Sequence, residues 1–177
     1  MEKKRIETIE SVLWDDDYFT GLSPEMVVKD TKLEGKLEGY SMTVIKMPHK
    51  DSNKLAKYAV VVCHDNAVVG TYSWFEVTYT DRNDRDIDII NLLPGWLDCA
   101  ADKSLVINNE PIVAFVEQIW LDEGYSPALL NEMKDCFTGT CNAKMAFAAP
   151  LEDGEDLNIT NLGFNPTGNA DIYAITL

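Results

Sequence analysis

The sequence predicts a single α/β (α+β) domain with a mixed, mostly antiparallel central sheet flanked by helices. Two segments rich in Val, Tyr, Trp and Phe are separated by only two turn residues, which indicates an antiparallel hairpin. A later apolar strand-like run leads directly into an amphipathic helical run and then into another short apolar run. With 177 residues, of which 46% are hydrophobic, the chain is long enough for one full core. No convincing internal boundary is visible, so we expect one domain over residues 1–177.

Residues 1–56 are expected to be helical at first and irregular afterwards. The segment IETIESVLW has apolar residues near helical spacing. In LSPEMVVKD, Ser23 is the expected N-cap of a second helix and Pro24 its first residue. The segment KLEGKLEG, residues 32–39, is a short tandem echo with two glycines, and we expect a flexible connection rather than a repeat.

Three strands are expected next. They are YSMTVIKMP, which ends at a proline, and then KYAVVVCH and AVVGTYSWFEVTYT. Asp65 and Asn66 separate the last two segments and tolerate the positive φ angles of a tight hairpin. Gly70 inside the third segment indicates a bulge or a close backbone approach. TDRNDRD is an expected loop, and DIINLLPGWLDCAAD is expected to form two short helical pieces interrupted by its Pro-Gly pair.

The second half begins with PIVAFVEQIWLD, the longest strand candidate, whose nearly continuous apolar character predicts a central strand. SPALLNEMKDCF follows as an expected helix with Ser126 as N-cap and Pro127 at its first position. One face of this helix carries Leu129, Leu130 and Met133. KMAFAAP is an expected short buried strand, EDLNITNLGF a weak helix or turn, and NADIYAITL a terminal strand.

The strong acidity of the chain limits the classes of partner that it is expected to bind. Thirty acidic and fifteen basic residues give a formal net charge of −15, which disfavours direct nucleic-acid binding because phosphate contacts need clustered Lys and Arg. The carboxylates are spread along the sequence, so we rank solubility above a DNA-mimic inhibitor as their purpose. No apolar stretch approaches the roughly 20 residues of a membrane span, and MEKKRIETIE lacks an apolar signal core. A cytoplasmic protein, or one inside a virus particle assembled there, is expected, with no membrane partner.

Neither a metal site nor a familiar catalytic motif is predicted. Cys63 and Cys99 lie in apolar segments typical of buried thiols, and only Cys136 and Cys141 are closely spaced, without a second pair. The sequence contains no nucleophile elbow, no Walker loop and no dinucleotide fingerprint. The sequence therefore predicts neither metal chemistry nor the reactions that these three motifs carry out.

Residues 57–177 resemble the GCN5-related N-acetyltransferase (GNAT) family. The resemblance rests on the hairpin with Gly70 in its second strand, the VEQIWLD strand, the helix and short strand after it, and the NLGF segment before the last strand. The most specific piece is Leu162-Gly163-Phe164, where family members turn from the last helix into the final hairpin. The resemblance implies an acyl-CoA N-acyltransferase-like fold that holds acetyl-CoA between two splayed parallel strands.

In this family a glycine-rich loop with an arginine or glutamine binds the pyrophosphate at the N-terminus of the following helix. Leu121, Gly124, Tyr125 and Ser126 are the residues that match this cofactor-binding loop. The sequence departs from the family here, because the arginine and one glycine are missing and Pro127 supplies no amide donor. The stretch predicts a compact corner, so no cofactor is the preferred expectation and acetyl-CoA is the cofactor if the protein is active.

The resemblance also implies candidate catalytic residues. Glu117 on the central strand stands near the place of the family's general base, and Glu76 is a second candidate. Ile159 occupies the place of the tyrosine that protonates the leaving thiolate in many members, so Tyr125 or Tyr173 would have to replace it. For Glu117 we favour the alternative that it is a solvated or paired carboxylate on a sheet face.

The leading hypothesis is a non-catalytic GNAT-like protein that acts by protein–protein contact, with a protein partner or in a homo-oligomer. The shortened cofactor loop and the strong acidity would suit an accessory or virion-associated protein of a phage or mobile element. The alternative is an acetyl-CoA-dependent N-acetyltransferase acting on a cationic amine, to which an acidic surface is suited.

Overall fold

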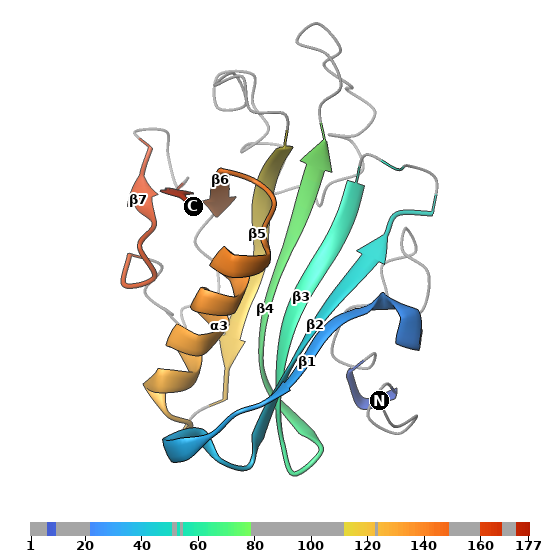
Figure 1. Cartoon of the computed structure of the whole chain (residues 1–177). Coiled ribbons are helices and arrows are strands. Elements are labelled where there is room, and N and C mark those ends of the chain that lie inside the picture. Colours follow the sequence, from blue (N-terminus) through green and yellow to red (C-terminus); the bar gives the residue numbers. More distant parts are fainter. Residues whose placement is uncertain are drawn as a thin grey trace, which may run out of the picture.

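The computed structural model describes residues 7–9, 22–50, 53, 55–78, 112–122, 124–148, 160–167 and 173–177. Eight strands in this part of the chain form one sheet in the order β1-β2-β3-β4-β5-β6-β8-β7 (Figure 1). The strands are β1 (Val27–Lys32), β2 (Tyr40–Pro48), β3 (Leu55–His64), β4 (Ala67–Thr78), β5 (Ile112–Leu121), β6 (Met145–Ala148), β7 (Asn165–Pro166) and β8 (Tyr173–Thr176). Helix α3 (Pro127–Thr140) and the 3-10 turns η1 (Pro24–Met26) and η2 (Gly35–Leu37) accompany them. The fold is therefore α+β with a mixed sheet, as the sequence predicts.

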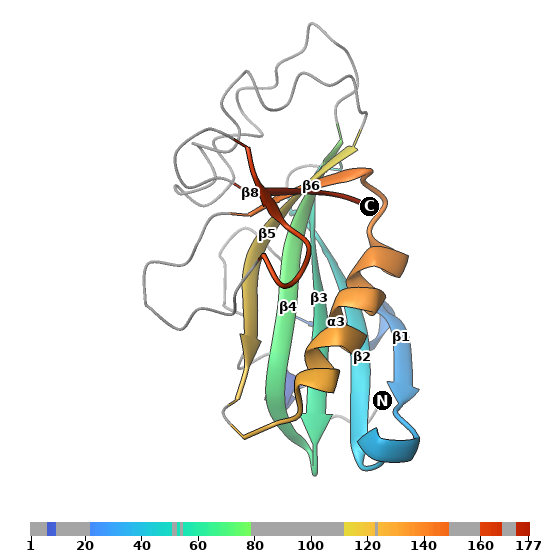
Figure 2. The ribbon, with the colours of Figure 1, turned by 90° about the vertical axis from the view of Figure 1, so that its left-hand side faces the viewer.

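All neighbouring strands are antiparallel except β5 and β6, which run parallel. Parallel neighbours need a crossover connection, and α3 lies on that connection between β5 and β6. Helix α3 lies along one face of the sheet, against β3 and β4 (Figures 1 and 2). The central position predicted for PIVAFVEQIWLD is confirmed, since β5 lies between β4 and β6.

The hairpin between β3 and β4 is confirmed at its turn and at its glycine. Asp65 and Asn66 have φ angles of 50° and 67°, as a tight two-residue connection requires. A Cβ added at Gly70 would lie 2.9 Å from the carbonyl oxygen of Trp120, so the backbones of β4 and β5 approach closely here. The register between β3 and β4 also shifts next to Gly70.

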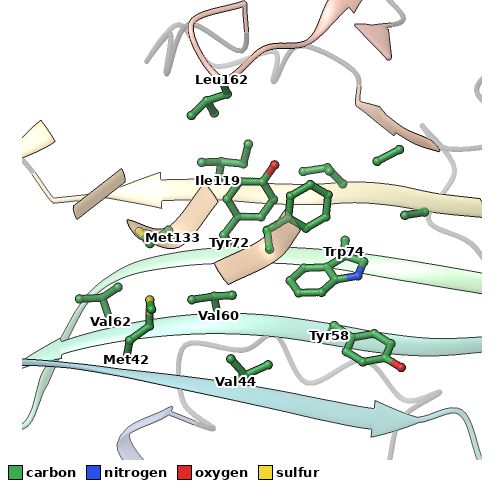
Figure 3. Close-up of a cluster of buried hydrophobic side chains, with 14 of the residues drawn as sticks. Met42, Val44, Tyr58, Val60, Val62, Tyr72, Trp74, Ile119, Met133 and Leu162 are labelled. Carbon is green, nitrogen blue, oxygen red and sulfur yellow. The ribbon is translucent and has the colours of Figure 1, made fainter. Parts of the chain in front are cut away.

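The sheet separates two hydrophobic clusters. The cluster on the α3 face contains Tyr72 and Trp74 from β4, packed against Met133 and Phe137 of the helix (Figure 3). The second cluster uses the alternate residues of the same strands, such as Phe75 and Phe115, and also includes Ile9. We call the side of this second cluster the opposite face.

One expectation for the N-terminal part is wrong. LSPEMVVKD forms only the single turn η1 and continues as strand β1, although Ser23 and Pro24 predicted a helix. The β-branched Val27 and the residues after it pair with β2, and this tertiary pairing overrides the local start signal. KLEGKLEG leads from β1 to β2 and contains η2, with Gly35 and Gly39 at φ angles of 65° and 93°.

Several predicted segments lie outside the described residues. These are residues 80–111, with Cys99, and residues 149–159, with Ile159. Of IETIESVLW only residues 7–9 are described, and they are helical. NLGF lies at the end of a turn and leads directly into the short strand β7, which the sequence did not predict. In the part of the chain that is described, no helix is long and apolar enough to cross a membrane.

Candidate functional site

The most unusual feature of the central strand is a β-bulge at Glu117. Val116 pairs with Trp74 and Gln118 pairs with Ser73, so Glu117 is an extra residue without a counterpart in β4. As a result Glu117 and Gln118 both reach hydroxyl groups on the same face of β4. Ser73 Oγ donates to Glu117 Oε2 at 2.9 Å, and Thr71 Oγ1 donates to Gln118 Oε1 at 3.4 Å.

Glu117 is held in a buried ion pair with Lys57 of β3. Lys57 Nζ lies 3.1 Å from Glu117 Oε1 and 2.9 Å from Oε2. The Lys57 side chain is 3% exposed and that of Glu117 is 18% exposed, so this pair is largely withdrawn from solvent. The Lys57 amine also lies 5.5 Å from the ring centroid of Phe75. The Lys57 ammonium group donates to Oε1 and the Ser73 hydroxyl to Oε2, so both oxygens of the Glu117 carboxylate already accept hydrogen bonds from the protein.

Glu76 is only 6% exposed and lies on the α3 face, opposite to Glu117. Its Oε1 accepts from Trp74 Nε1 and from the Asn142 backbone N–H, both at 3.0 Å. Its Oε2 accepts from Asn142 Nδ2 at 2.9 Å. This carboxylate therefore fastens the end of α3 to β4. The pairing of sequence-distant Glu76 and Asn142 could not have been read from the sequence.

Three side chains in or against the α3-face cluster have raised pKa values. Burial, with the Glu76 carboxylate as the second cause, raises the pKa of the Cys141 thiol to about 12. The same two causes raise the pKa of the Tyr58 hydroxyl, whose ring stacks on Trp74 at 5.3 Å. Burial also raises the pKa of Tyr72. All three groups stay protonated at neutral pH, so Cys141 is not a reactive thiolate.

Four N–H groups at the corner between β5 and α3 donate hydrogen bonds within the protein. Asp122 N donates to Val69 O at 2.8 Å, and Tyr125 N donates to Asp122 O at 3.3 Å. At the start of α3, Ala128 N donates to Ser126 Oγ at 3.2 Å and Leu129 N to Ser126 O at 2.9 Å.

The predicted cap of α3 at Ser126 is thus confirmed, with Pro127 at the first helical position. Gly124 has a φ of 86°, which fits a tight turn, and a Cβ added there would have no atom within 4 Å. Leu121, the last residue of β5, pairs with Gly70 and packs at the margin of the α3-face cluster. The four loop residues suggested for cofactor binding therefore lie together, in a corner whose N–H groups at Tyr125, Ala128 and Leu129 are already bonded.

Tyr125 packs into an aromatic group with Tyr40 and His64. The ring centroids of Tyr40 and His64 lie 4.5 Å apart, and that of Tyr125 lies 5.9 Å from Tyr40 and 6.2 Å from His64. The structure thus distributes the three suggested catalytic residues over three places. Glu117 lies on the opposite face, Glu76 under the end of α3, and Tyr125 at the β5–α3 corner.

Sequence reasoning missed Lys57, Ser73 and Asn142, because nothing in a strand pattern reveals which polar residues meet across it. The alternation of β3 could have shown that Lys57 falls on a buried face, among Leu55 and Ala59. A lysine in that position requires a partner, and this was the available signal.

The parallel pairing of β5 with β6 is short. Its paired residues are Ala114 with Ala146, Phe115 with Phe147 and Val116 with Ala148. Beyond Val116, strand β5 continues through the bulge and is paired with β4 up to Leu121. The bulge therefore begins where the described parallel pairing ends.

No protein-family model matches this chain, and no curated protein matches it. Among the described residues, no group of three or more His, Cys, Asp or Glu side chains is placed to hold a metal ion.

Proposed function

We propose that this chain is a GNAT-like protein without catalytic activity that works by binding another protein. The single observation that carries the proposal is the β5–α3 corner. A pyrophosphate cradle needs N–H groups at the helix start that are open to a ligand. Here Tyr125 and Leu129 donate to backbone carbonyls, Ala128 donates to the Ser126 side chain, and Pro127 has no N–H.

The GNAT-like architecture is supported by the form of the sheet. Four antiparallel strands, β2 to β5, are followed by a parallel neighbour that a helix connects, and the C-terminal strands complete the sheet. The bulge lies on the central strand beside the end of the parallel pairing. Apart from this bulge, the arrangement agrees with what the resemblance of residues 57–177 implies.

The absence of catalysis is supported by the state of the two glutamates. Glu117 is neutralised by Lys57, and Glu76 accepts three hydrogen bonds on the other face of the sheet. A general base must be within hydrogen-bond reach of the proton that it removes and able to accept it. Both carboxylates are instead used to connect elements of the fold.

The test is a calorimetric titration with acetyl-CoA up to about 1 mM, which would register a site worth only about 4 kcal/mol. We expect no saturable heat from the parent protein. A saturable signal that is weakened by Gly124→Pro but unchanged by Gly139→Ala would overturn the proposal. Gly139 is a suitable control because it lies in α3 outside the corner, with open space around its Cβ position.

The second candidate function is N-acetyl transfer to a cationic amine, and one specific observation favours it. The bulge presents Glu117 where β5 leaves its parallel pairing with β6, which is the place that acetyl-CoA occupies in the family. In this reaction the amine attacks the thioester carbonyl, and an amide and the free thiol of CoA are formed. A polyamine incubated with acetyl-CoA should then release thiol at a rate that Glu117→Gln abolishes, whereas the leading proposal requires no release above the uncatalysed rate.

A further inference from the structure

Three connections that are distant in the sequence meet at one end of the sheet. They are the β1–β2 connection with η2, the β3–β4 hairpin and the β5–α3 corner (Figures 1 and 2). Each contributes one ring to a group that we call the aromatic corner: Tyr40, His64 and Tyr125. Tyr40 and His64 are cross-strand neighbours, but Tyr125 comes from a different connection, so strand pairing alone does not explain the group.

The aromatic corner is only partly covered. All three residues are half-buried, and the His64 side chain retains 35% exposure. Gly39 lies directly against the His64 ring, since a Cβ added there would be 3.5 Å from His64 Nε2. Gly124, next to Tyr125, has open space on its Cβ side. A ligand could therefore approach the rings from the side of the connections.

The charges that border this end of the sheet are mainly negative. The described exposed charges at this end of the sheet are four carboxylates and two amines: Glu34, Glu38, Asp65, Asp122, Lys32 and Lys36. Asp65 Oδ2 lies 3.6 Å from His64 Nδ1, and the Asp65 side chain is 89% exposed, so this carboxylate remains accessible to a partner. The surroundings thus repel a phosphate group and attract a cation.

Half-exposed aromatic rings bordered by carboxylates have the chemistry that recognises ammonium and guanidinium groups. The chain as a whole carries a formal net charge of −15, which would steer a basic partner toward it. We propose that the aromatic corner binds Lys or Arg side chains of a basic segment of a partner protein. This inference rests on the proposed function, because it names the class of partner for a non-catalytic binding protein.

The experiment titrates the full chain with a peptide of six arginines spaced by glycines, followed by NMR of backbone amides and aromatic rings. We expect saturable shifts at Tyr40, His64 and Tyr125, and binding about fivefold weaker for Tyr125→Leu. Tyr125→Phe keeps the ring and should bind as the parent does. Circular dichroism of each variant shows whether the fold is retained.

A matched pair of variants separates an effect at the aromatic corner from a general effect of the net charge. Asp65→Asn and Asp135→Asn each remove one exposed carboxylate, but Asp135 lies on α3 and not at the aromatic corner. We expect only Asp65→Asn to weaken peptide binding by more than about twofold. Equal effects of the two variants, or shifts spread evenly over the acidic surface, would overturn the inference and indicate unspecific attraction of a polycation.

The acetyl-CoA titration of the same protein separates this inference from the function on which it rests. If acetyl-CoA binds saturably at the β5–α3 corner, the proposed function fails whatever the peptide does. If neither acetyl-CoA nor the peptide binds, only the aromatic corner as a cation site is overturned.

Discussion

Replacing Lys57 by methionine is expected to destabilise the protein by about 3 kcal/mol, because it leaves a largely buried carboxylate without its cation. Loss of one partner from a fully buried ion pair typically costs about 3 to 5 kcal/mol. The lower end of this range applies here, since the Glu117 side chain is still 18% exposed and keeps the Ser73 hydroxyl as a donor. Methionine retains most of the apolar stem of Lys57, so packing against Phe75 changes little.

Urea unfolding followed by circular dichroism at neutral pH measures this change in the free energy of unfolding. The control is the double variant Lys57→Met/Glu117→Gln, in which the glutamine carbonyl can still accept from Ser73. We expect this double variant to recover at least half of the loss, because the unpaired charge is gone. A loss below about 0.5 kcal/mol for Lys57→Met alone would refute the reasoning, since it would mean that the pair behaves like an exposed one.

Three further predictions concern a glycine, a cap and a thiol. Gly70→Ala should lower the free energy of unfolding by about 1 to 3 kcal/mol, because the added Cβ would lie 2.9 Å from the Trp120 carbonyl oxygen. Gly139→Ala in α3, where the Cβ position is open, should instead raise it by about 0.5 to 1 kcal/mol. Ser126→Ala should cost about 1 kcal/mol through loss of the α3 cap, and Ser126→Asp should restore it. The Cys141 thiol, with a pKa raised from 9.0 to about 12, should react slowly with a disulfide reagent at pH 8 until the protein is unfolded in urea.

The raised pKa of Cys141 also fixes the sign of a pH dependence. Below pH 9 the thiol is protonated in both the folded and the unfolded chain, so its contribution to stability is fully present. Between pH 9 and about 12 only the unfolded chain loses the proton, and the free energy of unfolding must fall. Cys141→Ala should reduce this alkaline fall, as measured by urea unfolding at a series of pH values. An identical fall in the variant, or equal thiol reactivity in folded and unfolded protein, would contradict the assignment.

Local signals in the sequence were sufficient for the β3–β4 hairpin and for the start of α3. Asp65 and Asn66 specified the hairpin through their tolerance of positive φ, and Ser126 with Pro127 specified where α3 begins. The same kind of signal failed at Ser23 and Pro24, because the valines that follow gain more from pairing with β2 than from continuing a turn. Local chemistry predicts an element only where tertiary pairing does not compete with it.

The candidate site was predictable in part. Glu117 and Glu76 were selected on the resemblance, but no local pattern shows that they lie on opposite faces of the sheet, each with its own partners. Tyr125 was selected as a possible acid, whereas the structure packs it with Tyr40 and His64. These partners are separated by many residues along the chain, and periodicity carries no information about contacts between distant strands.

The bulge on β5 can be tested by removing one residue from it. Strict alternation from Val116 would direct Gln118 toward α3, but with Glu117 inserted it is Ile119 that faces the helix and packs near Tyr72 (Figure 3). Deleting either Glu117 or Gln118 therefore leaves a regular strand whose apolar residues keep their faces. The core does not require the extra residue, and its effect is that both Glu117 and Gln118 reach hydroxyl groups of β4.

The two deletions leave different side chains beside Lys57. Deletion of Gln118 keeps the carboxylate beside Lys57, and we expect a stability within about 1.5 kcal/mol of the parent. Deletion of Glu117 places the amide of Gln118 there instead and should cost about 3 kcal/mol more, the same amount as breaking the pair by substitution. Urea unfolding of both variants measures the difference. Equal stabilities would show that a carboxylate beside Lys57 adds no stability over an amide, and would contradict the stabilising role assigned to the ion pair.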